Sequence, residues 1–271
     1  MTKRRRKQRH SHSFLSVIVS IIVLAGAWYF TGGTPSSLND LVQQATNMVT
    51  PKTTTDTTTG DLAKLTYQSG KPAFIYVNHN KAKLNPQKWQ TNHVVYSVLD
   101  HFNRTSTGNL AYLESRNLAS DSNRVRQYVE PTGWHQKFVD GQPIINRGHL
   151  IAYSISKGIN QNGQYNPADT SGDQNNPKNL FTQTAFSNQR VQTIFEQKIR
   201  DALRDGKRVI FFAKPEFRDH ELMARGIHLK AISTDKSLNF NVYLYNVQPN
   251  VSFDYATGRS TIDRNMHVPE P

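Results

Sequence analysis

The chain has 271 residues and no cysteine, which excludes disulfides, thiolate metal sites and a cysteine nucleophile. Its formal charge of +13 at pH 7 favours an anionic partner, such as nucleic acid or an anionic lipid surface. Six of the positive charges lie within the first nine residues, and the rest of the chain is still basic. Charge alone does not separate a nucleic-acid surface from a basic surface that only confers solubility.

The N-terminal region has the pattern of a segment that delivers the rest of the chain. A basic tail over residues 1–12 precedes residues 13–31, whose apolar stretch ends in Trp28 and Tyr29. The stretch is just long enough to cross a bilayer, and the positive charges before it place the N terminus inside. This pattern predicts a single-pass anchor in a bacterial plasma membrane. The alternative is a signal peptide cleaved near Ala27, after a small-residue site, and either reading places the remainder outside the cell.

Two regions of different composition follow. Residues 32–61 are poor in large apolar side chains and end in a threonine-rich tract. Such a segment buries too little surface to offset its ordering entropy, so we predict a flexible linker. Residues 62–271 have a mixed α and β pattern and predict one extracellular globular domain.

Strand and helix signals recur within this domain. Runs rich in β-branched and aromatic residues predict strands at residues 74–77, 93–98, 208–213 and 240–245. An amphipathic helix is predicted between residues 186 and 205, with Gly206 in the position of a C-cap. A polar run over residues 156–179 precedes the helix, and loops of that length inside a domain are often functional.

Two elements carry candidate chemistry. Residues 144–151 read as a strand with apolar ends and a polar centre that contains Arg, Gly and His. On the predicted helix, Asn188 lies towards the apolar face, where an asparagine is a poor core residue. Gln192 and Glu196 follow at steps of four, so the three side chains should form one ladder along the margin of that face. A solvated helix edge is the alternative explanation for Gln192 and Glu196.

These residues resemble the DNA/RNA non-specific endonucleases, a family of the ββα-metal class. The family pattern is Asp-Arg-Gly-His, then a loop, then a helix with an early asparagine, and here Asn-Arg-Gly-His at residues 146–149 is followed by Asn179 and Asn188. Further similar runs, including Pro-Thr-Gly-Trp at residues 131–134, extend the likeness over residues 73–261 to secreted and competence-type DNA-entry members. The resemblance implies an α+β fold with a mixed or antiparallel central sheet and flanking helices.

The resemblance also implies an activity and roles for named residues. The expected reaction is hydrolysis of DNA and RNA phosphodiesters without sequence preference. His149 would be the general base, because an imidazole with a pKa near ~6.5 can accept a proton from water. Asn188 would bind Mg²⁺, with Mn²⁺ as a substitute, and Glu196 would act through metal-bound water. Asn179 and Gln192 would support the site.

Arginines complete the expected site. Arg124 and Arg126 both lie where the family has its phosphate-binding arginine, and Arg147 of the motif is either catalytic or structural. The motif departs from the family at Asn146, which stands where the family has Asp. An amide keeps acceptor geometry but no charge, so we expect lower activity or an altered metal preference. Candidate flanking contacts to nucleic acid, each equally readable as a solvated charge, are Lys178, Arg190, Lys198 and Arg200.

A second function class fits the same charge and topology. A cell-surface receptor for DNA uptake could bind nucleic acid without cutting it. A base beside a metal ligand favours the enzyme, because a pure binder needs neither. The sequence identifies neither the biological purpose nor any uptake machinery or inhibitor that would act as a partner.

Overall fold

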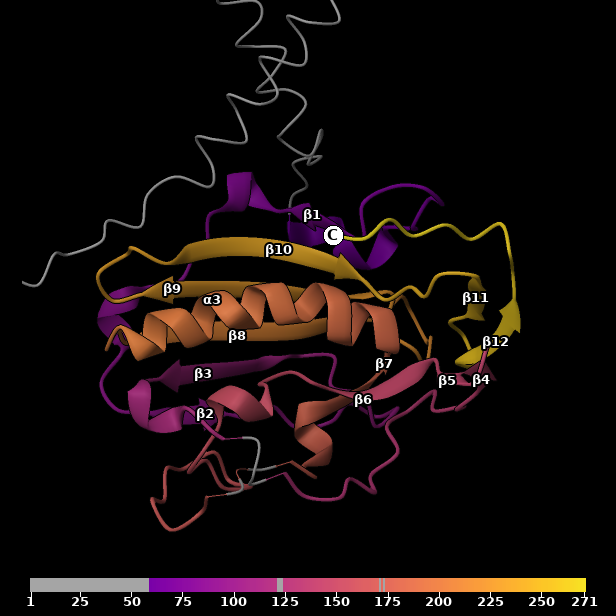
Figure 1. The fold of residues 1–271 in the computed structure, drawn as a ribbon. Helices are drawn as coiled ribbons and strands as arrows, with labels where there is room; N and C mark the ends of the chain where they lie inside the picture. Colours follow the sequence, from indigo (N-terminus) through magenta and orange to yellow (C-terminus); the bar gives the residue numbers. More distant parts are fainter. Residues whose placement is uncertain (1–58, 121–123, 171, 173) are drawn as a thin grey trace, which may run out of the picture. The chain divides into compact units, whose positions relative to one another are not determined.

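The central element of the computed structural model is an antiparallel sheet of six strands (Figure 1). The structure describes residues 59–120, 124–170, 172 and 174–271. The strand order is β1-β10-β9-β8-β3-β2, and every neighbouring pair is antiparallel. In chain order the strands are β1 (Phe74–Tyr76), β2 (His93–Val95), β3 (Asn109–Leu113), β8 (Val209–Glu216), β9 (Gly226–Ser233) and β10 (Asn239–Tyr245).

Three two-stranded antiparallel ladders accompany the central sheet. They are β4 (Phe138–Val139) with β5 (Gln142–Pro143), β6 (Ile145–His149) with β7 (Leu180–Thr184), and β11 (Val251–Asp254) with β12 (Arg259–Ile262). Short 3-10 helices lie at Thr59–Lys64, Asn78–Asn80, Pro86–Lys88, Ser115–Asn117, Tyr153–Ile155 and Pro177–Asn179. The predicted α+β class is confirmed, and the sheet is antiparallel throughout its described strands.

Four of the predicted strands correspond to β1, β2, β8 and β10 of the central sheet, and the strand predicted at residues 144–151 corresponds to β6. In the central sheet, β3 and β9 were not predicted. In β9, Ile227, Leu229 and Ala231 belong to the main core, while Ile232 packs on the opposite face of the sheet. These three core residues alternate with His228 and Lys230, so the strand pattern was present in the sequence and was missed. β2 ends at Val95, earlier than predicted.

The α-helix of the described residues, α3 (Thr193–Arg204), lies across one face of the central sheet (Figure 1). Its fully buried Phe195 contacts the rings of Phe74 and Phe240, with centroids 5.3 and 5.4 Å apart. The helix ends as predicted, because Gly206 adopts a φ of 75° and its N–H bonds to the Leu203 carbonyl. The flanking helices of the expected fold are thus one α-helix and short helical turns.

The other face of the sheet has a smaller cluster of its own. Tyr112, Ile210 and Ile232 are buried there, and Leu84 and Trp89 pack against them. Neighbouring residues of a strand point to opposite faces, and Phe211 belongs to the core under α3. The loop that carries Leu84 and Trp89 therefore lies on the side of the sheet away from α3.

The predicted delivery segments fall outside this description. The tail at residues 1–12, the anchor at residues 13–31 and the linker at residues 32–61, except for its last three residues, are not among the described residues. In the described part of the chain, no helix combines the length and the apolar character needed to span a bilayer.

Candidate active site

The predicted motif lies on a strand–strand–helix unit formed by β6, β7 and α3. β6 pairs with β7 in antiparallel register, with Asn146 opposite Gln183 and His149 opposite Leu180. The chain then turns directly from β7 into the helical segment that ends with α3. This arrangement brings the motif of residues 146–149 against the start of the helix, although nearly forty residues of sequence separate them.

The helical segment begins with a π-helical turn at Ser187–Gln192 instead of the predicted α-helix. A π-turn is wider than an α-turn and shifts the side chains that follow it around the helix axis. Asn188 and Glu196 both line a cleft, whereas Gln192 is completely buried beneath it. The alternative of a solvated edge is therefore wrong for Gln192 and Glu196, which are both buried, whereas the predicted neighbourhood of these two side chains is confirmed by their hydrogen bond of 2.8 Å.

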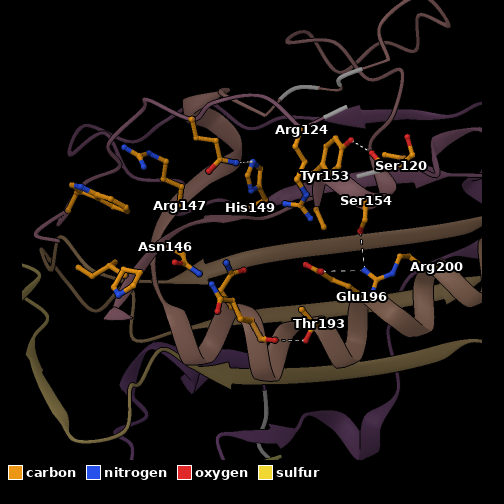
Figure 2. A pocket seen from close by; sticks show the side chains of 18 of the residues that line it. Ser120, Arg124, Asn146, Arg147, His149, Tyr153, Ser154, Thr193, Glu196 and Arg200 are labelled. Carbon is orange, nitrogen blue, oxygen red and sulfur yellow. Dashed lines mark hydrogen bonds and ion pairs between the residues drawn. The ribbon is translucent and has the colours of Figure 1, made fainter. Parts of the chain in front are cut away.

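This cleft, which we call the central cleft, has a volume of about 780 Å³ (Figure 2). Arg124 and His149 point into it from the side opposite α3, and α3 contributes Glu196 and Arg200 (Figure 2). The predicted residues that line it are Arg124, Asn146, Arg147, His149, Asn188, Glu196 and Arg200. Arg204 also lines it, and Glu196 is the one acidic side chain among the described lining residues, so the cleft is positively charged.

His149 is held in one tautomer by its neighbours. Its Nε2 lies 3.1 Å from the carbonyl oxygen of Gln174, so Nε2 carries the proton and donates to that oxygen. The amide of Gln127 is farther away, at 3.4 Å from the same nitrogen. Burial and the positive charge of Arg124 lower the pKa of His149 to about 4, while the Gln174 contact acts in the opposite direction. The ring is therefore neutral at physiological pH, with Nδ1 as its acceptor.

Glu196 is 8% exposed and is contacted from two sides. Gln192 donates a hydrogen bond of 2.8 Å to its Oε1, and the Arg200 guanidinium lies 3.7 Å from its Oε2. The pKa of Glu196 is raised because burial outweighs the opposing effects of the Gln192 bond and of the charges of Arg200 and Arg124. The carboxyl group is thus a fixed acceptor at the wall of the cleft.

Beneath the cleft, glutamine side chains join the two halves of the unit. Gln192 Nε2 donates to the backbone carbonyl of His149 at 3.0 Å as well as to Glu196. Gln192 Oε1 accepts a bond of 2.9 Å from Gln183 Nε2. Gln183 crosses over Gly148, where an added Cβ would lie 2.3 Å from Gln183 Oε1. The glycine of the motif is required because any side chain there would displace this amide.

Asn179 continues the pairing of β6 and β7 with its side chain. Its Nδ2 donates to the carbonyl of Ile151 at 3.0 Å, and its Oδ1 accepts from the N–H of Ile151 at 2.9 Å. The side chain is buried and does not line the central cleft. It fixes the backbone just after His149, so its position is that of a support.

The three candidate arginines have different surroundings. Arg124 lines the cleft, and its guanidinium lies over the ring of Tyr153 at 5.0 Å. Arg126 is exposed and is not among the lining residues. Arg147 lines the cleft but donates to the carbonyl of Val129 and lies over the ring of Trp134 at 4.5 Å. Arg147 thus also fastens a neighbouring loop to β6.

The four predicted flanking cations are distributed over different surfaces. Arg200 lines the cleft and donates to Ser154 Oγ at 3.0 Å. Arg190 is exposed and pairs with Glu270 near the C terminus at 3.0 Å. Lys198 lies over the ring of Phe195, and Lys178 is half-buried; neither lines the central cleft.

Sequence reasoning missed the glutamines around the site. Gln127 approaches His149, Gln174 supplies the carbonyl that fixes its tautomer, and Gln183 anchors Gln192. Gln174 comes from the long polar loop that was expected to be functional. The signal for Gln183 was a lone amide within the buried strand β7, where a polar side chain requires internal partners.

Comparison with known proteins agrees with this arrangement. Residues 82–235 match the DNA/RNA non-specific endonuclease family. The crystal structure of NucA from Streptococcus agalactiae with a magnesium ion bound is 30% identical, covers 70% of this chain and 87% of its own, and superposes with a TM-score of 0.60. The structure of the same protein with no metal bound gives the same identity, coverage and TM-score. The chain therefore belongs to the DNA/RNA non-specific endonuclease family and is a nuclease.

Proposed function

We propose that the chain hydrolyses phosphodiester bonds of both DNA and RNA without sequence preference, with His149 as general base and Mg²⁺ held by Asn188. The observation that carries the proposal is that His149, Asn188 and Glu196 reach one positively charged cleft from consecutive elements of the β6–β7–α3 unit. Membership of the family supports the reaction class.

The donors present fit a lightly coordinated, hydrated ion. Asn188 offers one neutral amide oxygen, and the buried carboxylate of Glu196 lies in the same cleft. Among the described residues, no three His, Cys, Asp or Glu side chains group into a metal site. Mg²⁺ keeps several of its waters and is often bound by few protein ligands together with substrate phosphate, so Asn188 would bind it and Glu196 would orient its waters. Bound Mg²⁺ would neutralise charge on the phosphoryl and leaving oxygens.

Two protein side chains, His149 and Arg124, have the remaining catalytic roles. Nδ1 of His149 removes a proton from a water molecule, and the resulting hydroxide attacks phosphorus. The bond to the leaving oxygen breaks, and that oxygen takes a proton from solvent. Arg124 makes charge-assisted bonds to the phosphoryl oxygens and stabilises the negative charge that builds on them. Contacts of this kind involve phosphate rather than base edges, which accounts for cutting without sequence preference.

We also propose that the domain works outside the cell. The basic tail and apolar stretch of residues 1–31 support export, either as an anchored protein or after cleavage near Ala27. The intact mass of the exported protein distinguishes these two forms, because cleavage removes the N-terminal segment.

Plasmid nicking tests the activity. The protein should convert supercoiled plasmid to nicked and linear forms in Mg²⁺, and EDTA should stop the reaction. His149→Ala should lower kcat by about 10²- to 10⁴-fold, because the general base is lost, while DNA binding in EDTA and Tm stay close to wild type. Supercoiled plasmid that survives the wild-type protein in Mg²⁺, despite measurable binding, would instead identify a receptor.

A magnesium titration tests Asn188. Asn188→Ala should raise the Mg²⁺ concentration for half-maximal activity by at least about tenfold, because the ion loses its protein ligand. Asn188→Asp retains an oxygen at the same position and should bind Mg²⁺ far better than the alanine variant. Identical Mg²⁺ curves for wild type and Asn188→Ala would remove this residue from the metal site.

The neighbouring arginines Arg124 and Arg126 offer a matched pair for a pH profile. Because the pKa of His149 is about 4, wild-type kcat/KM should hold down to about pH 5, where a free imidazole of pKa ~6.5 is mostly protonated. Arg124→Gln removes a cation that lowers this pKa, so the acid limb should move to higher pH, and kcat/KM should fall by about 10²-fold. Arg126→Gln should leave the acid limb of the profile in place and should change kcat/KM by no more than a few-fold. Equal effects of both variants on the acid limb and on kcat/KM would exclude a specific role for Arg124.

Gln192 is testable as a residue that positions both His149 and Glu196. Gln192→Met keeps the approximate volume but removes both donated bonds, so we expect a loss of stability of about 1–3 kcal/mol. Activity should also fall, with kcat reduced by at least about tenfold and KM nearly unchanged, because His149 and Glu196 are no longer held in position relative to each other. A variant that melts earlier but keeps its kcat below its melting range would show that Gln192 serves folding alone.

A further inference from the structure

A second cavity, which we call the side groove, lies next to the central cleft and has a volume of about 520 Å³. Trp134 and Gln136 line both cavities, so the two are contiguous. The remaining residues of the side groove come from the segment before β4 and from the start of β12, and they are Glu130, His135, Lys137, Arg259 and Ser260.

The side groove has cations that no carboxylate neutralises. Neither Lys137 nor Arg259 forms an ion pair with any described residue, and Lys137 Nζ contacts only the backbone carbonyl of Ser260, at 3.4 Å. Among the described residues, Glu130 is the one acidic residue that lines the groove. Cations without internal partners remain available for an anionic ligand.

The position of these cations relative to His149 is fixed. Gln136 Nε2 donates to the carbonyl of Ile145 at 2.7 Å, and Gln136 Oε1 accepts from the N–H of Ile145 at 3.2 Å. Ile145 begins β6, the strand that ends with His149. Beneath the groove, Trp134 packs on a buried cluster that joins β6 to the β11–β12 hairpin. The groove is therefore preformed, so ligand binding there costs little conformational entropy of the protein.

The lining of the groove suits phosphate better than it suits bases. The ring of Trp134 has the Arg147 guanidinium stacked over it at 4.5 Å, so that face does not accept a nucleobase. Lys137 and Arg259 offer only donors, which suit phosphate oxygens. A strand that places one phosphate in the central cleft continues on one side towards these two cations.

On the basis of the proposed function, we propose that the side groove binds the part of the nucleic-acid strand that flanks the scissile phosphate, with Lys137 and Arg259 on its backbone phosphates. The substrate is then a polynucleotide that occupies both cavities. A small diester with one phosphate occupies only the central cleft.

Binding without cleavage is the direct test. The affinity of a fluorescein-labelled single-stranded DNA of twelve nucleotides is measured by anisotropy in EDTA for the full-length protein. Lys137→Ala/Arg259→Ala should raise Kd about tenfold and should reduce the slope of log Kd against log salt by about 1.4, because two phosphate contacts are lost. The control Lys83→Ala/Lys88→Ala removes the same charge from exposed positions on the side of the sheet away from α3, and should stay within twofold.

Cleavage of two substrates separates the groove from the catalytic centre. For the double variant, kcat/KM on the oligonucleotide in Mg²⁺ should fall about tenfold, whereas kcat/KM on bis(p-nitrophenyl) phosphate should be unchanged. If the double variant melts early, Arg259→Gln alone should show about half of the effect on log Kd.

Two results would overturn the proposal that the side groove binds the flanking strand. The first is that Lys137→Ala/Arg259→Ala and the control variant bind the DNA with equal affinity. The second is that kcat/KM of Lys137→Ala/Arg259→Ala falls equally on both substrates, which would mean that the changes act through the central cleft. If the wild-type protein hydrolyses neither substrate, the proposed function fails, while the anisotropy comparison still decides whether the groove binds DNA.

Discussion

The site depends on one buried amide, that of Gln192, which joins the strand of His149 to the helix of Glu196. Its two N–H groups are divided between the His149 carbonyl and the Glu196 carboxylate, at 3.0 and 2.8 Å. Because the side chain is fully buried, water cannot replace either bond, and a lost partner leaves a polar group unsatisfied at a cost of about 1–3 kcal/mol. The distance between β6 and α3 is therefore set by hydrogen bonds as well as by apolar contact.

Gly148 and Gln183 make this arrangement possible. The Gln183 side chain passes directly over Gly148 to reach Gln192 Oε1, and Ser187 accepts its second N–H bond at 3.1 Å. Gln183 Oε1 is buried without a hydrogen-bond partner among the described residues, so the network carries a desolvation cost. The glycine of the motif thus has a packing role. It admits an amide from the opposite strand, and that amide orients the residue that holds His149 and Glu196.

The electrostatic design follows from the same geometry. Among the described residues, four arginines and a single acid line the central cleft, so the field favours an anionic ligand, while burial and Arg124 keep His149 neutral. The amide at Asn146 is consistent with this balance, because a carboxylate there would add a second negative charge to the cleft. The positive charge of the cleft thus comes from arginines, and its imidazole has a pKa lowered by burial and by one of them, Arg124.

The parts of the fold and site that were predictable are those encoded locally. The apolar spacing of residues 186–205 located the helix and its end at Gly206, and the motif identified His149 and Asn188 as residues of one cleft. The π-turn at Ser187–Gln192 was not predictable, because α- and π-helical hydrogen bonding are alternatives of the same local sequence. What distinguishes them here is tertiary: the π-turn buries Gln192 against Gln183 while Asn188 still reaches the cleft. A pattern of side chains along one helix cannot contain that information, since the partner that selects the turn lies on the opposing strand.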